Sequence, residues 1–94
     1  MPNCTPVTDV APATLYTQWP NYIDHHVRFP ARVVRTLGAT EALIVANSTQ
    51  FAVLLAPGQL WQGTQVHTFT VVGQTNLNLA GPITLPQLLF EDCK

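Results

Sequence analysis

The segment of residues 26–38, HVRFPARVVRTLG, most constrains how this chain can fold. Its first half alternates so that the apolar residues fall on one face, which is typical of a β-strand with one buried face. Arg35 falls in phase with this apolar set, and a strand cannot place an unpaired arginine in a core. We therefore predict a β-bulge or sharp bend between Val33 and Arg35 that turns Arg35 outward. A long first strand that bends midway can belong to two sheets at once, as a small closed barrel requires.

The N-terminal part of the chain predicts a flexible lead followed by a short helix. Residues 1–10 contain prolines and small polar residues, so we interpret them as an extended lead and residues 11–94 as a single domain. Pro12 is well placed as the first residue of a helix that continues over residues 14–19. Pro20 should end or kink this helix, because proline cannot continue the helical hydrogen-bond pattern.

Four further strands are expected after the first one, from alternation and from the turn-forming residues between them. They are residues 41–47, residues 50–55, residues 65–74, and a last strand around Leu77, Leu79 and Ile83 that Gly81-Pro82 interrupts. Alternation places Val27, Phe29, Val33, Leu43, Val45 and Val53 in the core. The connector over residues 57–64 should form a turn or a short helical plug at the end of the barrel.

These elements predict an all-β fold, a five-stranded OB-fold barrel with a short N-terminal helix. An SH3-like barrel or a small sandwich is the alternative, but neither explains the long connector as well.

Composition and charge limit the classes of function. Hydrophobic residues make up 47% of the 94 residues and charged residues only 10%. This composition is too apolar for a disordered chain, and so few charges indicate that another chain covers part of the surface. A monomer with an uncharged, Thr- and Gln-rich surface is the alternative. The formal net charge of −1 argues against strong autonomous binding to nucleic acid, which depends on many phosphate contacts.

The sequence shows no pattern of catalytic or metal-binding residues. His25, His26 and His67 are the only histidines, and they do not form a recognisable cluster of metal ligands. A nucleophile elbow and a glycine-rich phosphate loop are also missing, so we expect neither an enzyme nor a cofactor. Cys4 and Cys93 lie near the two ends, and two free thiols are favoured over a disulfide between them.

Single-strand-binding barrels combine a basic groove with aromatic platforms. Three of the four basic residues, Arg28, Arg32 and Arg35, lie in the first strand and are the candidate nucleic-acid-binding residues. Phe51 or Trp61 could supply a stacking face. The alternative is that these aromatic residues belong mainly to the core.

The C-terminal tail is unusually apolar, with Leu85, Leu88, Leu89 and Phe90 within six residues. Neither strand nor helical spacing turns all of these side chains inward. We therefore expect at least one of Leu88, Leu89 and Phe90 to lie on a partner-binding surface. The alternative is that the tail folds back over the open end of the barrel.

Several short motifs resemble a known family. They are Tyr22-Ile23-Asp24, the residues Val27, Phe29, Ala31, Arg32 and Val33, the strand of residues 42–47, residues 54–57, and Val71-Val72-Gly73. Over roughly residues 12–90 the chain resembles the smallest subunit of replication protein A, whose first strand usually carries a glycine where this chain has Ala31. The smallest subunit of the telomeric CST complex has the same architecture and is the nearest rival.

The resemblance implies a non-catalytic subunit that assembles and stabilises a heterotrimeric complex binding single-stranded DNA in replication, repair and recombination. Its partners would be the larger OB-fold subunits, which contact most of the DNA, and its location would be nuclear, with no membrane association. The family continues into an amphipathic helix where this chain stops, at Lys94, so either the chain is truncated or it assembles differently. A free-standing nucleic-acid-binding barrel and a secreted domain joined through Cys4 and Cys93 are the other hypotheses.

Overall fold

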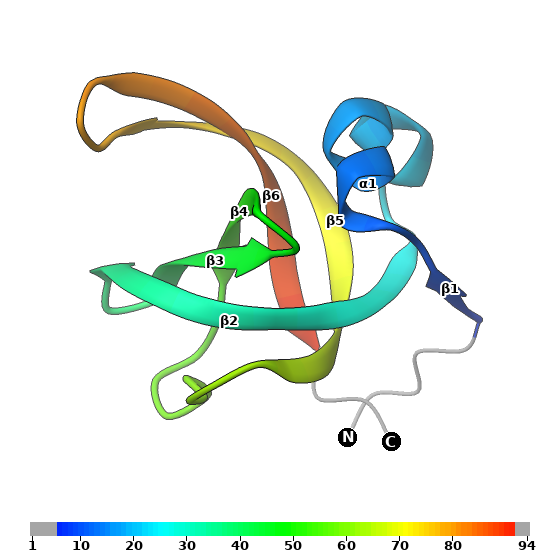
Figure 1. The fold of residues 1–94 in the computed structure, drawn as a ribbon, viewed down its shortest axis with the longest axis horizontal. Coiled ribbons are helices and arrows are strands. Elements are labelled where there is room, and N and C mark those ends of the chain that lie inside the picture. Colours follow the sequence, from blue (N-terminus) through cyan, green and yellow to red (C-terminus); the bar gives the residue numbers. More distant parts are fainter. Residues whose placement is uncertain (1–5, 92–94) are drawn as a thin grey trace.

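The computed structural model describes residues 6–91 and shows a barrel in which β2 (His26–Gly38) is one long, curved strand of the wall (Figure 1). Its first half pairs antiparallel with β5 (Gln65–Asn78), and its second half pairs antiparallel with β3 (Glu41–Ala46). The register shifts between Val33 and Arg35, and Arg35 is exposed. The predicted bulge is therefore confirmed. β2 pairs with a different strand in each half, but all strands belong to one continuous sheet and not to two.

The remaining strands complete a closed, mixed barrel. The five barrel strands have the order β2-β3-β4-β6-β5, and the pairing of β5 with β2 closes the barrel. β4 (Thr49–Leu54) and β6 (Pro82–Glu91) are parallel neighbours, whereas the other four barrel pairings are antiparallel. The protein is thus mainly β, with a five-stranded closed barrel and a short helix near the N-terminus, as expected from the sequence. This arrangement is consistent with an OB-like fold.

The N-terminal helix covers one end of the barrel. α1 (Pro12–Gln18) begins at its proline as predicted, and it passes into the 3-10 helix η1 (Trp19–Tyr22), which contains Pro20. Leu15 is completely buried in the barrel core. The side chain of Leu15 therefore fixes α1 on the barrel.

A short strand precedes the helix, and the sequence analysis did not predict it. β1 (Val7–Asp9) pairs in parallel with the start of β2. The lead that we expected over residues 1–10 is therefore paired over residues 7–9, while residues 1–5 lie outside the described part of the chain. Cys4, Cys93 and Lys94 also lie outside it, so the expectation about the two thiols stays a prediction.

The core is continuous from the helix through all five barrel strands. Val27, Phe29 and Val53 are buried in it as predicted, whereas Val33 and Val45 are only partly buried. In β3 the inward residues are Ala42, Ile44 and Ala46. Leu43 is buried too, at 5% exposure, but outside this core cluster. The predicted phase of β3 was therefore wrong, because this strand is covered on both faces and its apolar residues do not alternate.

The C-terminal half of the barrel differs most from the expectation. β5 continues beyond the predicted residues 65–74 to Asn78, so Leu77 belongs to β5, Leu79 lies in the turn of residues 79–81, and Ile83 belongs to β6. The supposed tail of residues 85–90 belongs to β6 and closes the barrel against β4 and β5. In Figure 1 the β5–β6 hairpin, yellow to orange, extends beyond the barrel and curves above β3 and β4.

The connector between β4 and β5 forms no helix. It contains a turn at Pro57-Gly58, and Trp61 then inserts into the core, where it is 9% exposed. The Trp61 Nε1–H group donates a hydrogen bond of 2.9 Å to the carbonyl of Ala31. Ala31 is the last β2 residue paired with β5, so Trp61 links the connector to the point where β2 changes its partner from β5 to β3.

Within residues 6–91 no helix has the length and apolar character that a membrane span needs.

Candidate nucleic-acid and partner surfaces

The three candidate arginines lie on β2 but do not form one basic patch. Arg28 lies next to β1, where its guanidinium donates two hydrogen bonds to Asp9, of 3.0 Å from Nε and 3.2 Å from Nη2. The hydrogen bonding to Arg28 is the larger cause, and the positive charge of Arg28 the second, of a pKa of Asp9 below its ordinary value. Asp9 and Arg28 thus form an ion pair on the surface, which the sequence analysis did not anticipate.

Arg32 and Arg35 lie further along β2, where this strand pairs with β3. Arg32 is the cross-strand neighbour of Val45, and Arg35 that of Leu43. Both arginines are exposed, and neither forms a salt bridge within residues 6–91. Arg32 faces outward by the alternation of β2, and the bulge between Val33 and Arg35 turns Arg35 outward as well. These two residues are therefore the unpaired positive charges of the described chain.

The two aromatic residues considered as stacking platforms are not available for stacking. Phe51 is completely buried, and Trp61 packs at ring-centroid distances of 4.4 Å from His67 and 5.6 Å from Phe90. Both rings point inward, so the alternative interpretation as core residues holds.

Tyr16 is the exposed aromatic ring of residues 6–91, and the sequence analysis missed it. It lies on α1, is 39% exposed and contacts the buried ring of Phe51 edge to face at 6.3 Å. Its neighbour Leu15 faces the core, which leaves the Tyr16 ring beside the barrel surface. The signal that could have found it is its position directly after Leu15, which puts it on a different face of the helix from that buried residue.

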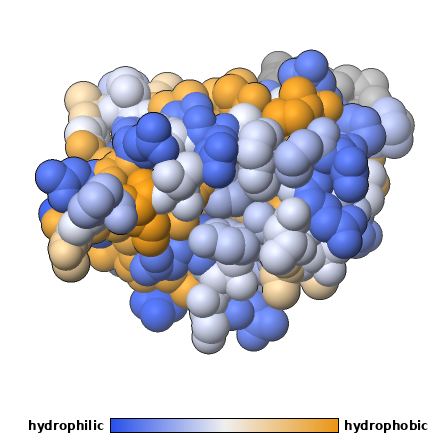
Figure 2. Space-filling model, turned by 90° about the horizontal axis from the view of Figure 1, so that it is seen from above, coloured by the Kyte–Doolittle hydropathy of each residue, from blue (hydrophilic) through white to orange (hydrophobic). Residues whose placement is uncertain are grey.

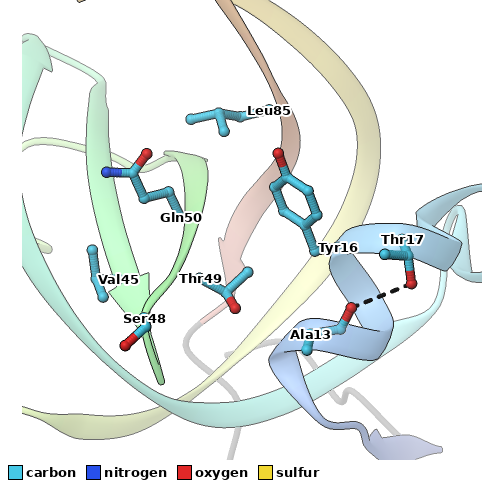
Figure 3. Close-up of a pocket in the computed structure, with 8 residues that line it drawn as sticks. All are labelled: Ala13, Tyr16, Thr17, Val45, Ser48, Thr49, Gln50 and Leu85. Atoms are coloured by element: carbon cyan, nitrogen blue, oxygen red, sulfur yellow. Dashed lines mark hydrogen bonds between the residues drawn. The ribbon is translucent and has the colours of Figure 1, made fainter.

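Tyr16 lines a pocket of about 390 Å³ between α1, the start of β4 and β6. Figure 3 shows the Tyr16 ring rising from the helix towards Leu85, with the side chain of Gln50 on the opposite wall. The Thr17 hydroxyl is bonded to the helix backbone at Ala13 and Thr14. The Tyr16 hydroxyl and the Gln50 amide, in contrast, have no hydrogen-bond partner within residues 6–91, so both can bond a ligand.

A second hollow, of about 540 Å³, adjoins this pocket and contains Arg32. Both hollows are lined by Val45 and Ser48. Asn47 and Ser48 form the tight β3–β4 turn and both have positive φ, as a two-residue hairpin turn requires. We call the two hollows together the Tyr16–Arg32 groove, and it is lined by Tyr16, Gln50, Leu85, Val45, Ser48 and Arg32.

The three candidate partner-binding residues of β6 have different environments. Leu88 is completely buried in the barrel core, and Phe90 is partly buried against it. Leu89 points outward and is 39% exposed. Leu88 therefore cannot contact a partner, and the physical reason is that it alternates inward along a barrel strand. The exposed apolar residue that we expected in this segment is Leu89.

A separate set of polar side chains, Thr70, His26 and Glu91, connects three strands of the barrel. The Thr70 hydroxyl donates a hydrogen bond of 3.0 Å to Glu91, and it lies 3.1 Å from Nδ1 of His26. Since the hydroxyl has one proton and gives it to Glu91, Nδ1 of His26 must be the donor to Thr70. This chain of bonds links β2, β5 and β6. Among residues 6–91, no three His, Cys, Asp or Glu side chains are grouped closely enough to hold a metal ion.

Comparison with protein-family models, with curated proteins and with solved structures found no match to this chain.

Proposed function

We propose that this protein is a non-catalytic, OB-like assembly subunit of a multi-subunit complex that binds single-stranded DNA in the nucleus. The observation that carries the proposal is the closed strand order β2-β3-β4-β6-β5 around a bent β2, with a helix before the barrel. Small barrels of this kind are common modules for binding single strands and for joining other modules. Of the motifs that resemble the smallest subunit of replication protein A, those of residues 27–33, 42–47 and 71–73 lie mainly on β2, β3 and β5. Tyr22-Ile23-Asp24 precedes β2, and residues 54–57 lead from β4 into the connector.

The charge distribution supports an assembly role over autonomous DNA binding. The net charge is −1, and one of the three β2 arginines is neutralised by Asp9. Affinity for DNA rises with the number of phosphates that a protein neutralises. Two unpaired arginines give a weak contact, so strong binding would have to come from partner subunits.

Exposed apolar side chains on neighbouring strands support a partner contact. Leu89 of β6 is 39% exposed, and Val72, at the bulge in the adjacent β5, is 43% exposed. Figure 2 shows that apolar surface also gathers where the β5–β6 hairpin lies, interspersed with hydrophilic side chains. Apolar patches of this kind often mark protein interfaces. We propose that the larger OB-fold subunits cover the surface around Leu89.

The test compares retention on single-stranded DNA beads of the purified chain and of the tagged chain in a lysate of its source cells. We expect the purified chain to wash off at physiological salt and the chain in the lysate to remain bound together with larger proteins. Leu89→Ser should reduce retention from the lysate, whereas Leu60→Ser, which changes an exposed leucine in the connector, should not. Equal retention of the purified chain and the chain in lysate would contradict the proposal.

A further inference from the structure

We propose that the Tyr16–Arg32 groove binds one nucleotide unit of an unpaired DNA strand. This inference rests on the proposed function and adds to it a direct contact between this subunit and DNA. A groove of this size on a barrel surface needs three features to hold a nucleotide: a flat apolar face for the base, a polar group for the edge of the base, and a positive charge for the phosphate.

The Tyr16 end of the groove has the features that a base requires. The Tyr16 ring is exposed and is held from behind by its edge contact with Phe51, so a base can stack on it without moving the core. Leu85 offers a second apolar wall to the same pocket. The Gln50 amide carries both a donor and an acceptor, and it can pair with the hydrogen-bonding edge of a base.

The Arg32 end has the features that a phosphate requires. Arg32 has no ion pair within residues 6–91, and a guanidinium suits phosphate oxygens in geometry and charge. Arg32, Val45 and Gln50 are successive cross-strand neighbours on β2, β3 and β4. Adjacent strands lie about 4.8 Å apart, so the backbones at Arg32 and Gln50 are separated by about 10 Å. Two long side chains at this backbone separation can contact two different parts of one nucleotide.

The polar groups favour a nucleotide over an aromatic side chain of a protein partner. A tyrosine or phenylalanine from another protein could stack on Tyr16. A phenylalanine would leave the Gln50 amide covered without a hydrogen bond, which is costly, and neither ring would give Arg32 a negative charge. A nucleotide satisfies both groups at once.

The test titrates the isotope-labelled full chain with an oligothymidylate of about ten nucleotides. NMR chemical shifts map the binding site, and fluorescence anisotropy of a labelled oligothymidylate measures the affinity. We expect weak binding that shifts the resonances of Tyr16, Ser48, Gln50 and the Arg32 side chain. Tyr16→Ala should weaken binding about tenfold and Tyr16→Phe by about twofold or less, because the ring carries the stacking. Arg32→Gln should lower the slope of log K against log salt by about 0.7.

Arg28→Gln is the matched control, because it removes the same charge from the same strand outside the groove. It should leave the salt slope unchanged. Gln50→Ala gives a second test if Tyr16→Ala does not fold, as judged by its NMR spectrum, and it should also weaken binding.

Three results would overturn the inference. They are no binding at millimolar oligothymidylate, shifts that map away from the groove, or shifts produced by N-acetyltyrosinamide and not by the oligonucleotide. Each would reject the nucleotide site alone, since the proposed function is tested separately by retention from the lysate.

Discussion

Replacing Trp61 by alanine should strongly destabilise the barrel, because this one side chain fixes the connector between β4 and β5. Trp61 is 9% exposed and packs against three rings, at centroid distances of 4.4 Å from His67, 5.6 Å from Phe90 and 6.3 Å from Phe69. It also donates the 2.9 Å hydrogen bond to the carbonyl of Ala31 at the bend of β2. The substitution therefore removes both apolar contacts and a backbone partner.

The expected loss can be estimated from these contacts. Truncation of a buried tryptophan to alanine costs about 3–5 kcal/mol in the free energy of unfolding. In a domain of this size that loss lowers the melting temperature by roughly 12–40 °C. Trp61→Phe keeps a ring but removes the N–H donor, so it should cost at least the hydrogen bond, about 1 kcal/mol. The total stability of a domain is about 5–15 kcal/mol, so the alanine variant should lose a large part of it.

Urea denaturation followed by circular dichroism measures these free energies. Leu60→Ala is the control, since Leu60 precedes Trp61 in the same connector but is 48% exposed. This change should cost no more than about 0.5 kcal/mol. A loss below about 1 kcal/mol for Trp61→Ala, or equal losses for the two variants, would refute the idea that Trp61 anchors the connector.

Two further predictions concern β6 and β1. Leu88→Ser should lower the free energy of unfolding by about 2–5 kcal/mol or more, since truncation of a buried leucine costs this much. Leu89→Ser should lower it by about 1 kcal/mol or less in the same urea assay. Similar losses for the two variants would show that Leu88 does not face the core. Asp9→Asn should lower the melting temperature slightly at neutral pH, because it removes the hydrogen-bonded ion pair to Arg28. Since this pair lowers the pKa of Asp9, its stabilisation is present above the ordinary Asp pKa of about 3.9 and is lost as the pH falls through the lowered pKa. The melting curves of the two proteins should therefore converge in strong acid, and a constant difference at every pH would rule out this contribution.

The fold was predictable where the sequence pattern conflicts with a regular strand. Arg35 in phase with Val33 required a bulge, and the structure has one at this position. The helix start at Pro12 was equally clear, because proline fits the first turn of a helix.

Other parts of the fold depend on contacts that the local sequence does not contain. In β3, Leu43 and Ile44 are both buried, on opposite faces, so alternation could not assign the inward set. In β5, the bulge between Val71 and Gly73 changes the phase midway along the strand. The closing strand β6 was mistaken for a tail, because Leu88 and Leu89 are both apolar although only Leu88 faces the core.

The candidate site was only partly predictable for the same reason. Arg32 and Arg35 were identified because β2 carries most of the basic residues. The ion pair between Arg28 and Asp9 was not predictable, because it depends on the parallel pairing of β1 with β2. Tyr16 and Gln50 come together only because α1 packs across the barrel end beside the start of β4. Tyr16 and Gln50 lie far apart in the sequence, which gave no indication that they line one pocket.

The proposed assembly role is tested most directly by affinity purification of the tagged chain from its source cells. The bound proteins are treated with nuclease before elution and are then identified by mass spectrometry. We predict that two larger OB-fold proteins co-purify in amounts comparable to the chain, and that they stay bound after the nuclease has removed DNA. Purification of the chain alone, or release of every bound protein by the nuclease, would contradict the role of an assembly subunit.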